Sequence, residues 1–178
     1  MILAKICILG EISVGKTSLI RRFVDRSFSD AYLTTVGVSV SRKRLQQGAP
    51  GKGGSDGLQL VLWDIEGGGS FDDLTSSYLK GARGAVVVGD LSRPPTITAA
   101  EQYMHRFLTI NPRGVIVVAL NKSDLDHDPG LLLRATPRSA PEILTTIKTS
   151  AQSGEGVDEL FTTLGAHILR DIGNADQT

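Results

Sequence analysis

The sequence has little cysteine, no net charge and no long hydrophobic run. Cys7 is the only cysteine among 178 residues, so no internal disulfide can form, and we expect a reducing, cytoplasmic setting. No apolar run approaches the roughly 18 residues that a membrane-spanning helix needs. The 19 basic residues balance the 19 acidic ones, which argues against nonspecific binding to nucleic acid. These absences exclude a disulfide-rich secreted protein and an integral membrane protein.

Glycine is the residue type in excess, with 20 residues, or about 11% against an average near 7%. It follows no collagen-like period, so we expect the excess at particular backbone positions. Five of the glycines crowd the polar segment Gln46 to Gly57, to which the sequence assigns no function. With 40% hydrophobic residues the chain is long enough to bury a core, and we expect a single domain over residues 1–178.

Short apolar runs rich in β-branched residues predict four buried strands: Ile2 to Leu9, Leu58 to Ile65, Ala85 to Leu91 and Val115 to Leu120. Their continuous apolarity is typical of a parallel sheet that is covered on both faces. A further strand is expected near Ile147. The segment Val36 to Leu45 is expected to pair with the strand that starts at Leu58 as an antiparallel edge hairpin.

Apolar residues at helical spacing predict a helix from Thr96 to Ile110 and another from Val157 to Ile172. The segment Leu125 to Thr146 holds three prolines. Although Ser139 and Glu142 fit a capping box, a helix there would soon meet the strand expected near Ile147. Strands and helices alternate, which predicts an open α/β sheet that binds its ligands at the carboxyl ends of the strands.

The segment Gly10 to Thr17 reads GEISVGKT and fits the phosphate-loop pattern G-x-x-x-x-G-K-[ST] directly after the first strand. Its glycines let successive N–H groups point inward at an anion, and the positive end of the next helix adds to the field. Lys16 is expected to bridge terminal phosphate oxygens, and the Thr17 hydroxyl is a hard oxygen ligand for Mg²⁺. An ordinary glycine turn is the alternative, and the strand–loop–helix setting argues against it.

A second motif addresses the base, since the phosphate loop alone leaves ATPases, kinases and GTPases open. Asn121 to Asp124 form N-K-x-D at the expected carboxyl end of a strand. An ionised Asp124 only accepts hydrogen bonds, and guanine offers two adjacent donors where adenine has no such pair. Lys122 can lay its methylene stem over the base plane. The two motifs together indicate a guanine nucleotide.

With these motifs the chain resembles the Ras-like small GTPase superfamily, most closely its Rab branch. The resemblance continues in KTSLIRRFVDRSFSDAYLTTVGV from Lys16, in WDIEG from Trp63 to Gly67 and in TSA from Thr149 to Ala151. The form WDIEG is similar to prokaryotic Rab-like GTPases. The resemblance implies a three-layer P-loop NTPase fold, a mostly parallel six-stranded sheet with one antiparallel edge strand and about five helices.

The resemblance also implies a function, that of a molecular switch that binds GTP or GDP with Mg²⁺, hydrolyses GTP and presents its switch segments to effector and regulatory proteins. Phe28 would then stack on guanine, and the N–H of Gly67 would sense the γ-phosphate. The implied catalytic residues are Lys16, Thr35 and Gly67, and the implied metal ligands are Thr17, Thr35 and, through water, Asp64. The implied nucleotide-binding residues are Gly10, Glu11, Ile12, Ser13, Val14, Gly15, Lys16, Thr17, Ser18, Phe28, Thr35, Gly67, Asn121, Lys122, Asp124, Ser150 and Ala151.

Three residues depart from the family pattern. Gly68 stands where relatives carry a glutamine that orients the attacking water, and Ile12 occupies a loop position that is small in most of them. Glu66 replaces an alanine, and its carboxylate could repel the γ-phosphate, bind Mg²⁺ or point away. We therefore expect slow hydrolysis. The alternatives are a pseudoGTPase-like interaction module that holds its nucleotide with little or no turnover, and an ATP-using enzyme, which Asp124 argues against.

Other residues carry weaker expectations. The chain ends in DIGNADQT without a cysteine or a basic tail, so no intrinsic lipid anchor is expected. Trp63 is either an effector contact or a half-covered strand residue. Cys7 is expected to be a small buried hydrophobe rather than a reactive thiol.

Overall fold

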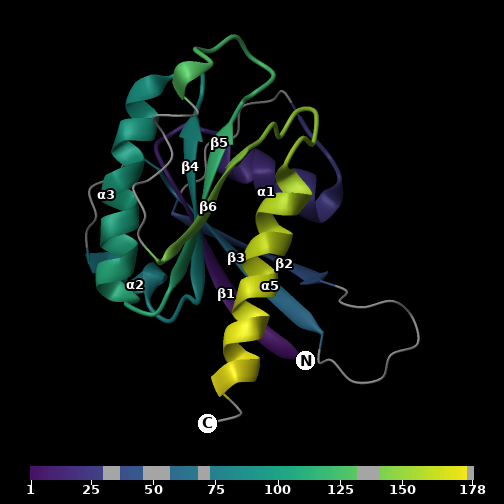
Figure 1. Cartoon of the computed structure of the whole chain (residues 1–178), viewed down its shortest axis with the longest axis vertical. Helices are drawn as coiled ribbons and strands as arrows, with labels where there is room; N and C mark the ends of the chain where they lie inside the picture. The colour runs from purple at the N-terminus through teal and green to yellow at the C-terminus, as the bar shows by residue number, and fades with distance from the viewer. Residues whose placement is uncertain (30–36, 46–56, 68–72, 132–140, 176–178) are drawn as a thin grey trace.

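The computed structural model describes residues 1–29, 37–45, 57–67, 73–131 and 141–175. Within these residues six strands form one sheet: β1 (Ile2–Leu9), β2 (Val38–Leu45), β3 (Leu58–Ile65), β4 (Gly84–Asp90), β5 (Val115–Asn121) and β6 (Ile143–Lys148). Four helices are described: α1 (Lys16–Asp25), α2 (Asp73–Leu79), α3 (Pro94–Ile110) and α5 (Val157–Ala175). Figure 1 shows their arrangement.

The strand order is β2-β3-β1-β4-β5-β6, and every pairing is parallel except that of β2 with β3 at one edge. The order reverses at β1, because β3 lies on one side of it and β4 on the other. At such a point the loops that leave neighbouring strands diverge and open a crevice at the carboxyl ends. The segment after β1 therefore begins where an α/β sheet binds its ligands.

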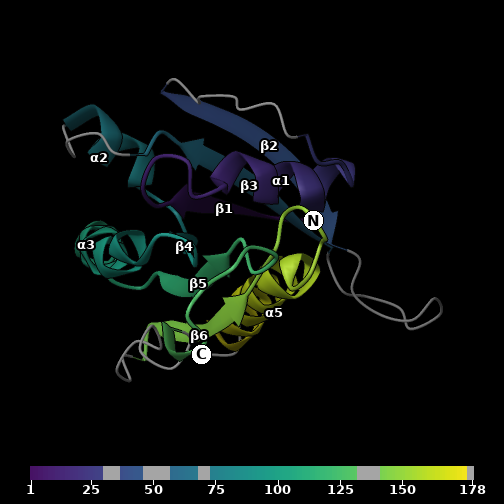
Figure 2. The same ribbon diagram turned by 90° about the horizontal axis from the view of Figure 1, so that it is seen from above.

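Helices cover both faces of the sheet, which gives three layers (Figures 1 and 2). On one face, α1 and α5 pack against the sheet and against each other, with the rings of Phe23 and Phe161 stacked 4.2 Å apart. On the other face, α2 and α3 bury Leu79 and Phe107 in a second hydrophobic cluster. The two clusters lie on opposite faces of the same sheet.

Burial along the strands explains their sequence patterns. Every residue of β4 and β5 is buried, since these central strands face helices on both sides. The edge strand β2 instead alternates between half-buried and exposed residues over most of its length. The uniform apolarity of Ala85 to Leu91 and Val115 to Leu120 is thus what a doubly covered strand requires.

The structure confirms the predicted strands, with changes at some ends. β1 and β3 have the predicted bounds, whereas β4 begins and ends one residue earlier than predicted. β2 pairs antiparallel with β3 as expected and begins at Val38. The helix predicted from Thr96 begins at Pro94, because a proline suits the first helical turn, where the backbone N–H would have no helical partner.

The capping-box interpretation of the segment before β6 is wrong. Glu142 lies in a turn, and β6 starts at the next residue, Ile143, so Glu142 is not in the first turn of a helix. Residues 132–140 of the segment Leu125 to Thr146, Ser139 included, are outside the described residues. Most of the Gln46 to Gly57 loop, residues 46–56, is also outside them.

Candidate nucleotide-binding site

The segment between β1 and α1 has the backbone that a phosphate loop requires. Gly10 and Gly15 have φ angles of 142° and 98°, in the region that favours glycine. A Cβ on Gly15 would lie 2.3 Å from Nδ2 of Asn121, so a side chain would also collide there. α1 begins directly afterwards at Lys16. The loop therefore turns tightly at the carboxyl end of the sheet, next to the N-terminus of a helix.

Lys16 lies inside this loop and is only 7% exposed. Its Nζ donates hydrogen bonds to the backbone oxygens of Gly10, at 2.9 Å, and Glu11, at 2.8 Å. Burial lowers the pKa of Lys16 to about 8, although the carboxylates of Asp64, Glu11 and Glu66 act in the opposite direction. Lys16 is thus a largely desolvated cation at the position where the motif places a terminal phosphate.

Thr17 and Asp64 bring two hard oxygen donors together. The Thr17 hydroxyl donates to Oδ2 of Asp64 at 2.5 Å. Asp64 lies near the end of β3 and is 3% exposed, so its carboxylate is buried beside Thr17. A hydroxyl and a carboxylate are ligands that suit Mg²⁺. Both residues were predicted as metal ligands, and the third, Thr35, lies outside the described residues.

Asn121 connects three of the predicted motifs. It ends β5 and is 1% exposed. Its Nδ2 donates to the backbone oxygen of Val14 in the phosphate loop at 2.9 Å. Its Oδ1 accepts from Thr149 Oγ1 and from the N–H of Ala151, both at 3.2 Å. One amide side chain therefore fixes the phosphate loop and the N-K-S-D and TSA segments relative to one another.

Asp124 and the TSA segment also meet directly. Ser150 Oγ donates to Oδ1 of Asp124 at 2.5 Å, and the Asp124 residue is exposed. Phe28, half-buried after α1, lies under the guanidinium of Arg22 at 5.9 Å from its ring centroid. Arg22 in turn donates from Nε to the backbone oxygen of Ala151 at 2.7 Å. Through Arg22, the predicted base-stacking residue is linked to the predicted base-reading segment.

The segment after β3 packs tightly on the phosphate loop. A Cβ on Gly67 would lie 2.4 Å from Nζ of Lys16 and 2.5 Å from the oxygen of Gly10, so only glycine fits there. The neighbouring Glu66 accepts a hydrogen bond from the N–H of Gly37 on its Oε2, and its own N–H donates to the Gly37 oxygen, both at 2.9 Å. Of the three possibilities for Glu66, the described arrangement directs its carboxylate to the backbone just before β2. Gly68 lies outside the described residues.

Comparison with known proteins identifies the family. The model of the Ras family matches residues 5–170. The chain belongs to the Ras family. It is 30% identical over 176 residues to the human Ras-related protein Rab-4A, with 98% of this chain and 78% of the relative covered. It is 31% identical to the Ras-related protein RIC1 of Oryza sativa subsp. japonica, with coverage of 99% and 85%, and 28% identical to the Ras-related protein Rab-1C of Dictyostelium discoideum, with coverage of 94% and 82%.

Membership in the Ras family confirms the predicted class of function. This Ras-family protein is a GTP-binding molecular switch and a GTPase, and its fold is that of a Ras-like P-loop GTPase. The comparisons give no support to the module that holds a nucleotide without turnover. No helix in the described part of the chain is long and apolar enough to cross a membrane.

In this Ras-family protein Asp90, at the end of β4, is a site residue that was not predicted from the sequence. Asp90 is fully buried, and its Oδ2 accepts from Nζ of Lys122 at 2.7 Å and from Nε of Arg93 at 2.9 Å. The signal that could have identified Asp90 is a carboxylate inside the apolar run Ala85 to Leu91, at the binding edge of the sheet. Thr149, the first residue of the TSA segment, was likewise not predicted as a site residue.

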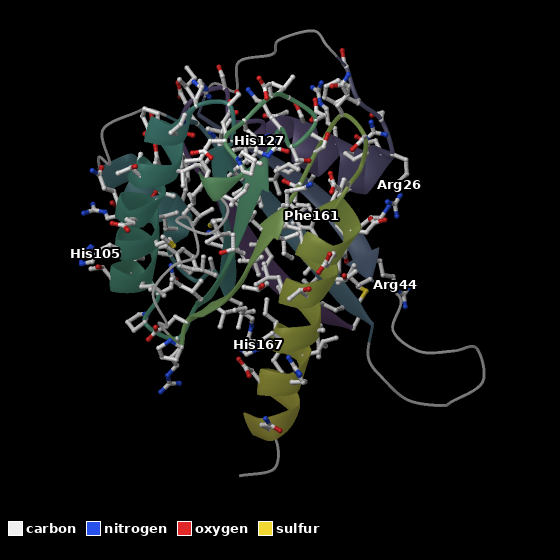
Figure 3. All side chains as sticks on the ribbon, turned by 45° about the horizontal axis from the view of Figure 1, so that its top comes forward. Arg26, Arg44, His105, His127, Phe161 and His167 are labelled. Carbon is white, nitrogen blue, oxygen red and sulfur yellow. The ribbon has the colours of Figure 1, made fainter. Side chains whose placement is uncertain are left out.

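The three histidines of this Ras-family protein lie on separate elements (Figure 3). His105 is on α3, His127 follows β5 and His167 is on α5. His127 contacts the backbone oxygen of Leu125, and His167 pairs with Asp171 at 3.3 Å. Within the described residues, no group of three or more His, Cys, Asp or Glu side chains is placed to hold a metal.

Proposed function

We propose that this protein holds GDP or GTP with Mg²⁺ at the carboxyl end of the sheet, in a single domain over residues 1–178. Two parts divide the work. The phosphate loop from Gly10 to Ser18 binds the phosphates, and the base is received by Asn121, Lys122, Asp124, Ser150 and Ala151 together with Phe28. The observation that carries the proposal is the set of hydrogen bonds made by Asn121, which joins the phosphate-binding and base-reading parts.

The residues present fit the metal that the family implies. Thr17 and Asp64 already share a hydrogen bond near the phosphate loop, and both offer hard oxygens, so we assign them to Mg²⁺, with Asp64 acting through water. Thr35 is the third proposed ligand. Mg²⁺, when bound, neutralises charge on the phosphate oxygens. The hydroxyl of Thr17 keeps Oδ2 of the buried Asp64 carboxylate hydrogen-bonded.

For hydrolysis, this chain has the groups that stabilise negative charge on the phosphate, but it lacks the side chain that orients the attacking water in relatives. Lys16 and the backbone N–H groups of the phosphate loop face the phosphates, where negative charge spreads during γ-phosphoryl transfer. Lys16 must then exchange the carbonyls of Gly10 and Glu11 for phosphate oxygens. Gly68 has no side chain with which to orient the attacking water, so we propose slow intrinsic hydrolysis.

The proposed surface for effector and regulatory proteins includes Trp63. Its indole is half-buried on β3, with Nζ of Lys5 3.9 Å from the ring centroid and the ring of Tyr78 at 6.2 Å. It immediately precedes Asp64 and lies on the strand that leads to Gly67. A partner bound over Trp63 would therefore contact a surface that continues toward Gly67, the residue implied to sense the γ-phosphate.

Replacing Asp124 by Asn tests the proposed reading of the base. The change trades a carboxylate, which accepts from guanine, for an amide that can donate to xanthine. A hydrogen bond to a charged group contributes about 1.5–3 kcal/mol, so we expect GDP to bind about 10- to 100-fold more weakly and xanthosine diphosphate to bind more tightly. Competition binding with the two nucleotides measures both changes.

Asp126→Asn is the matched control, since Asp126 is an exposed carboxylate two residues away. It should leave the guanine preference unchanged. Retained guanine preference in Asp124→Asn would mean that another residue reads the base.

A further inference from the structure

We propose that Asp90 is a positioning residue, one that fixes Lys122 and the phosphate loop relative to each other and so slows the release of bound guanine nucleotide. The inference rests on the proposed function, because it takes Lys122 to lie against the base. Asp90, Arg93, Lys122 and the carbonyl of Ile12 form a continuous set of polar contacts, here called the Asp90 bridge.

Asp90 has an unusually complete set of partners for a fully buried carboxylate. Oδ2 accepts from Lys122 Nζ at 2.7 Å and from Arg93 Nε at 2.9 Å. Oδ1 accepts from the N–H of Ser92 at 2.9 Å and from its hydroxyl at 2.6 Å. Burial alone would raise the pKa of Asp90, but the hydrogen bonds from Lys122, Ser92 and Arg93 outweigh it and hold the pKa below its ordinary value. Asp90 is thus a fixed negative charge under the base-binding motif.

The backbone around Asp90 is also fixed. Its N–H donates to Thr96 Oγ1 at 2.9 Å, which ties the end of β4 to the first turn of α3. In the sheet Asp90 pairs with Asn121, the residue before Lys122. The position of the Asp90 carboxylate is therefore fixed, and the ion pair forms only when the Lys122 side chain points toward it.

Lys122 needs such a partner because of its backbone. Its φ angle is 63°, in the left-handed region that residues with a side chain rarely adopt. Strained backbone persists only where the surroundings hold it. The ion pair with Asp90 anchors the Nζ end of the Lys122 side chain. Because both ends of the side chain are then fixed, its methylene stem keeps one conformation beside the base-reading residues.

Arg93 extends the bridge to the phosphate loop. While its Nε donates to Asp90, its terminal Nη2 donates to the backbone oxygen of Ile12 at 2.9 Å. One guanidinium thus spans the end of β4 and the loop predicted to hold the phosphates. Ile12 is 47% exposed, so the contact is made at the open side of the loop rather than in the core.

The test measures the rate at which radiolabelled GDP leaves the full chain in excess unlabelled GDP. Asp90→Asn keeps the shape of the side chain and removes its charge, and Lys122→Met removes the cation that it binds. Each change is expected to speed GDP release about tenfold or more, because a charge-assisted bond is lost. The double variant should release GDP no faster than the faster single variant, since both changes break the same contact.

Asp171→Asn is the matched control, because Asp171 is an exposed carboxylate on α5 that pairs with His167. It should release GDP at the original rate. Arg93→Gln provides a second route if Asp90→Asn does not fold, since Arg93 is 40% exposed. Arg93→Gln should speed release, and Arg93→Lys, which keeps the charge, should restore part of the retention.

Unchanged GDP release in Asp90→Asn, or effects of Asp90→Asn and Lys122→Met that simply multiply in the double variant, would overturn the inference. So would equal acceleration by Arg93→Lys and Arg93→Gln. Failure of the proposed function would appear elsewhere, as unchanged base preference in Asp124→Asn. The two failures are distinguishable because Asp90→Asn leaves Asp124 in place and should keep the preference for guanine.

Discussion

Lys16 is where burial and charge conflict most directly in this molecule. Its pKa is lowered from 10.5 to about 8, mainly by desolvation, and its ammonium donates hydrogen bonds to two loop carbonyls. A cation that is desolvated in the folded state and solvated in the unfolded state destabilises the fold at neutral pH. The bound phosphates would remove this conflict by supplying opposite charge.

A measurable pH dependence follows for the nucleotide-free protein. Because the pKa of Lys16 is lower in the folded state, the unfolded chain binds more protons between pH 8 and 10.5. The free energy of unfolding should therefore rise through that window, by on the order of 3 kcal/mol from this one group. Urea unfolding at several pH values would measure it. In Lys16→Met the rise should be reduced and the stability at pH 7 increased.

Lys80→Met is the control, since Lys80 is exposed at the end of α2. It should leave the rise in stability as it is in the original protein. A Lys16→Met protein with the same pH profile as the original would show that the Lys16 ammonium is well solvated without nucleotide.

Among the elements, α5 contains two glycines with different surroundings. A Cβ on Gly173 would meet nothing within 4 Å, whereas one on Gly165 would lie 2.4 Å from Cδ1 of Leu45 and 3.2 Å from Cδ2 of Leu58. Gly173→Ala should therefore stabilise the protein by about 0.5–1 kcal/mol, the helix-propensity gain. Gly165→Ala should gain less or lose stability, because Leu45 must shift. Thermal unfolding of the two variants under one set of conditions measures the difference, and equal effects would contradict it.

An element could be predicted from the sequence when the interactions that determine it are local in the chain. The runs Ile2 to Leu9 and Leu58 to Ile65 are apolar along their length, and this alone indicates buried strands, so their bounds were predicted correctly. The capping-box pair was misleading because a short local pattern competed with the sheet pairing of β6. Asp90 was overlooked because its partners, Lys122 above all, are brought to it by strand order rather than by sequence spacing. The contact of Glu66 with Gly37 likewise depends on the pairing of β2 with β3.

Across the whole molecule, the residues that we expect to stay in place are buried, whereas those that we expect to move are held by solvent-exposed contacts. Asn121, Asp90 and Lys16 are buried, Asn121 and Lys16 donate to carbonyls of the phosphate loop, and Asp90 pairs with Lys122. Glu66 and Gly37, by contrast, link two segments through contacts that are exposed to solvent. We expect exchange of GTP for GDP to change the second group and leave the first in place.

The lifetime of the GTP form tests the whole switch. Gly68→Gln restores a side chain that can orient the attacking water, so single-turnover release of phosphate from bound GTP should become faster, by about tenfold or more. Gly69→Gln, at the adjacent glycine, is the matched control and should not speed the reaction. If Gly68→Gln hydrolyses GTP no faster than the original protein, water orientation is not what limits the rate.

Trp63 gives the molecule an optical consequence. It is the single tryptophan of the chain, its indole has an ammonium over its face, and its ring neighbours that of Tyr78 in α2. Indole emission depends on nearby charge and on solvent access, and Trp63 lies four residues before the glycine that packs on Lys16. Movement of α2 or of the segment after β3 would therefore alter the native fluorescence of the protein, and the GDP and GTP forms would differ in the wavelength or intensity of Trp63 emission without any added label.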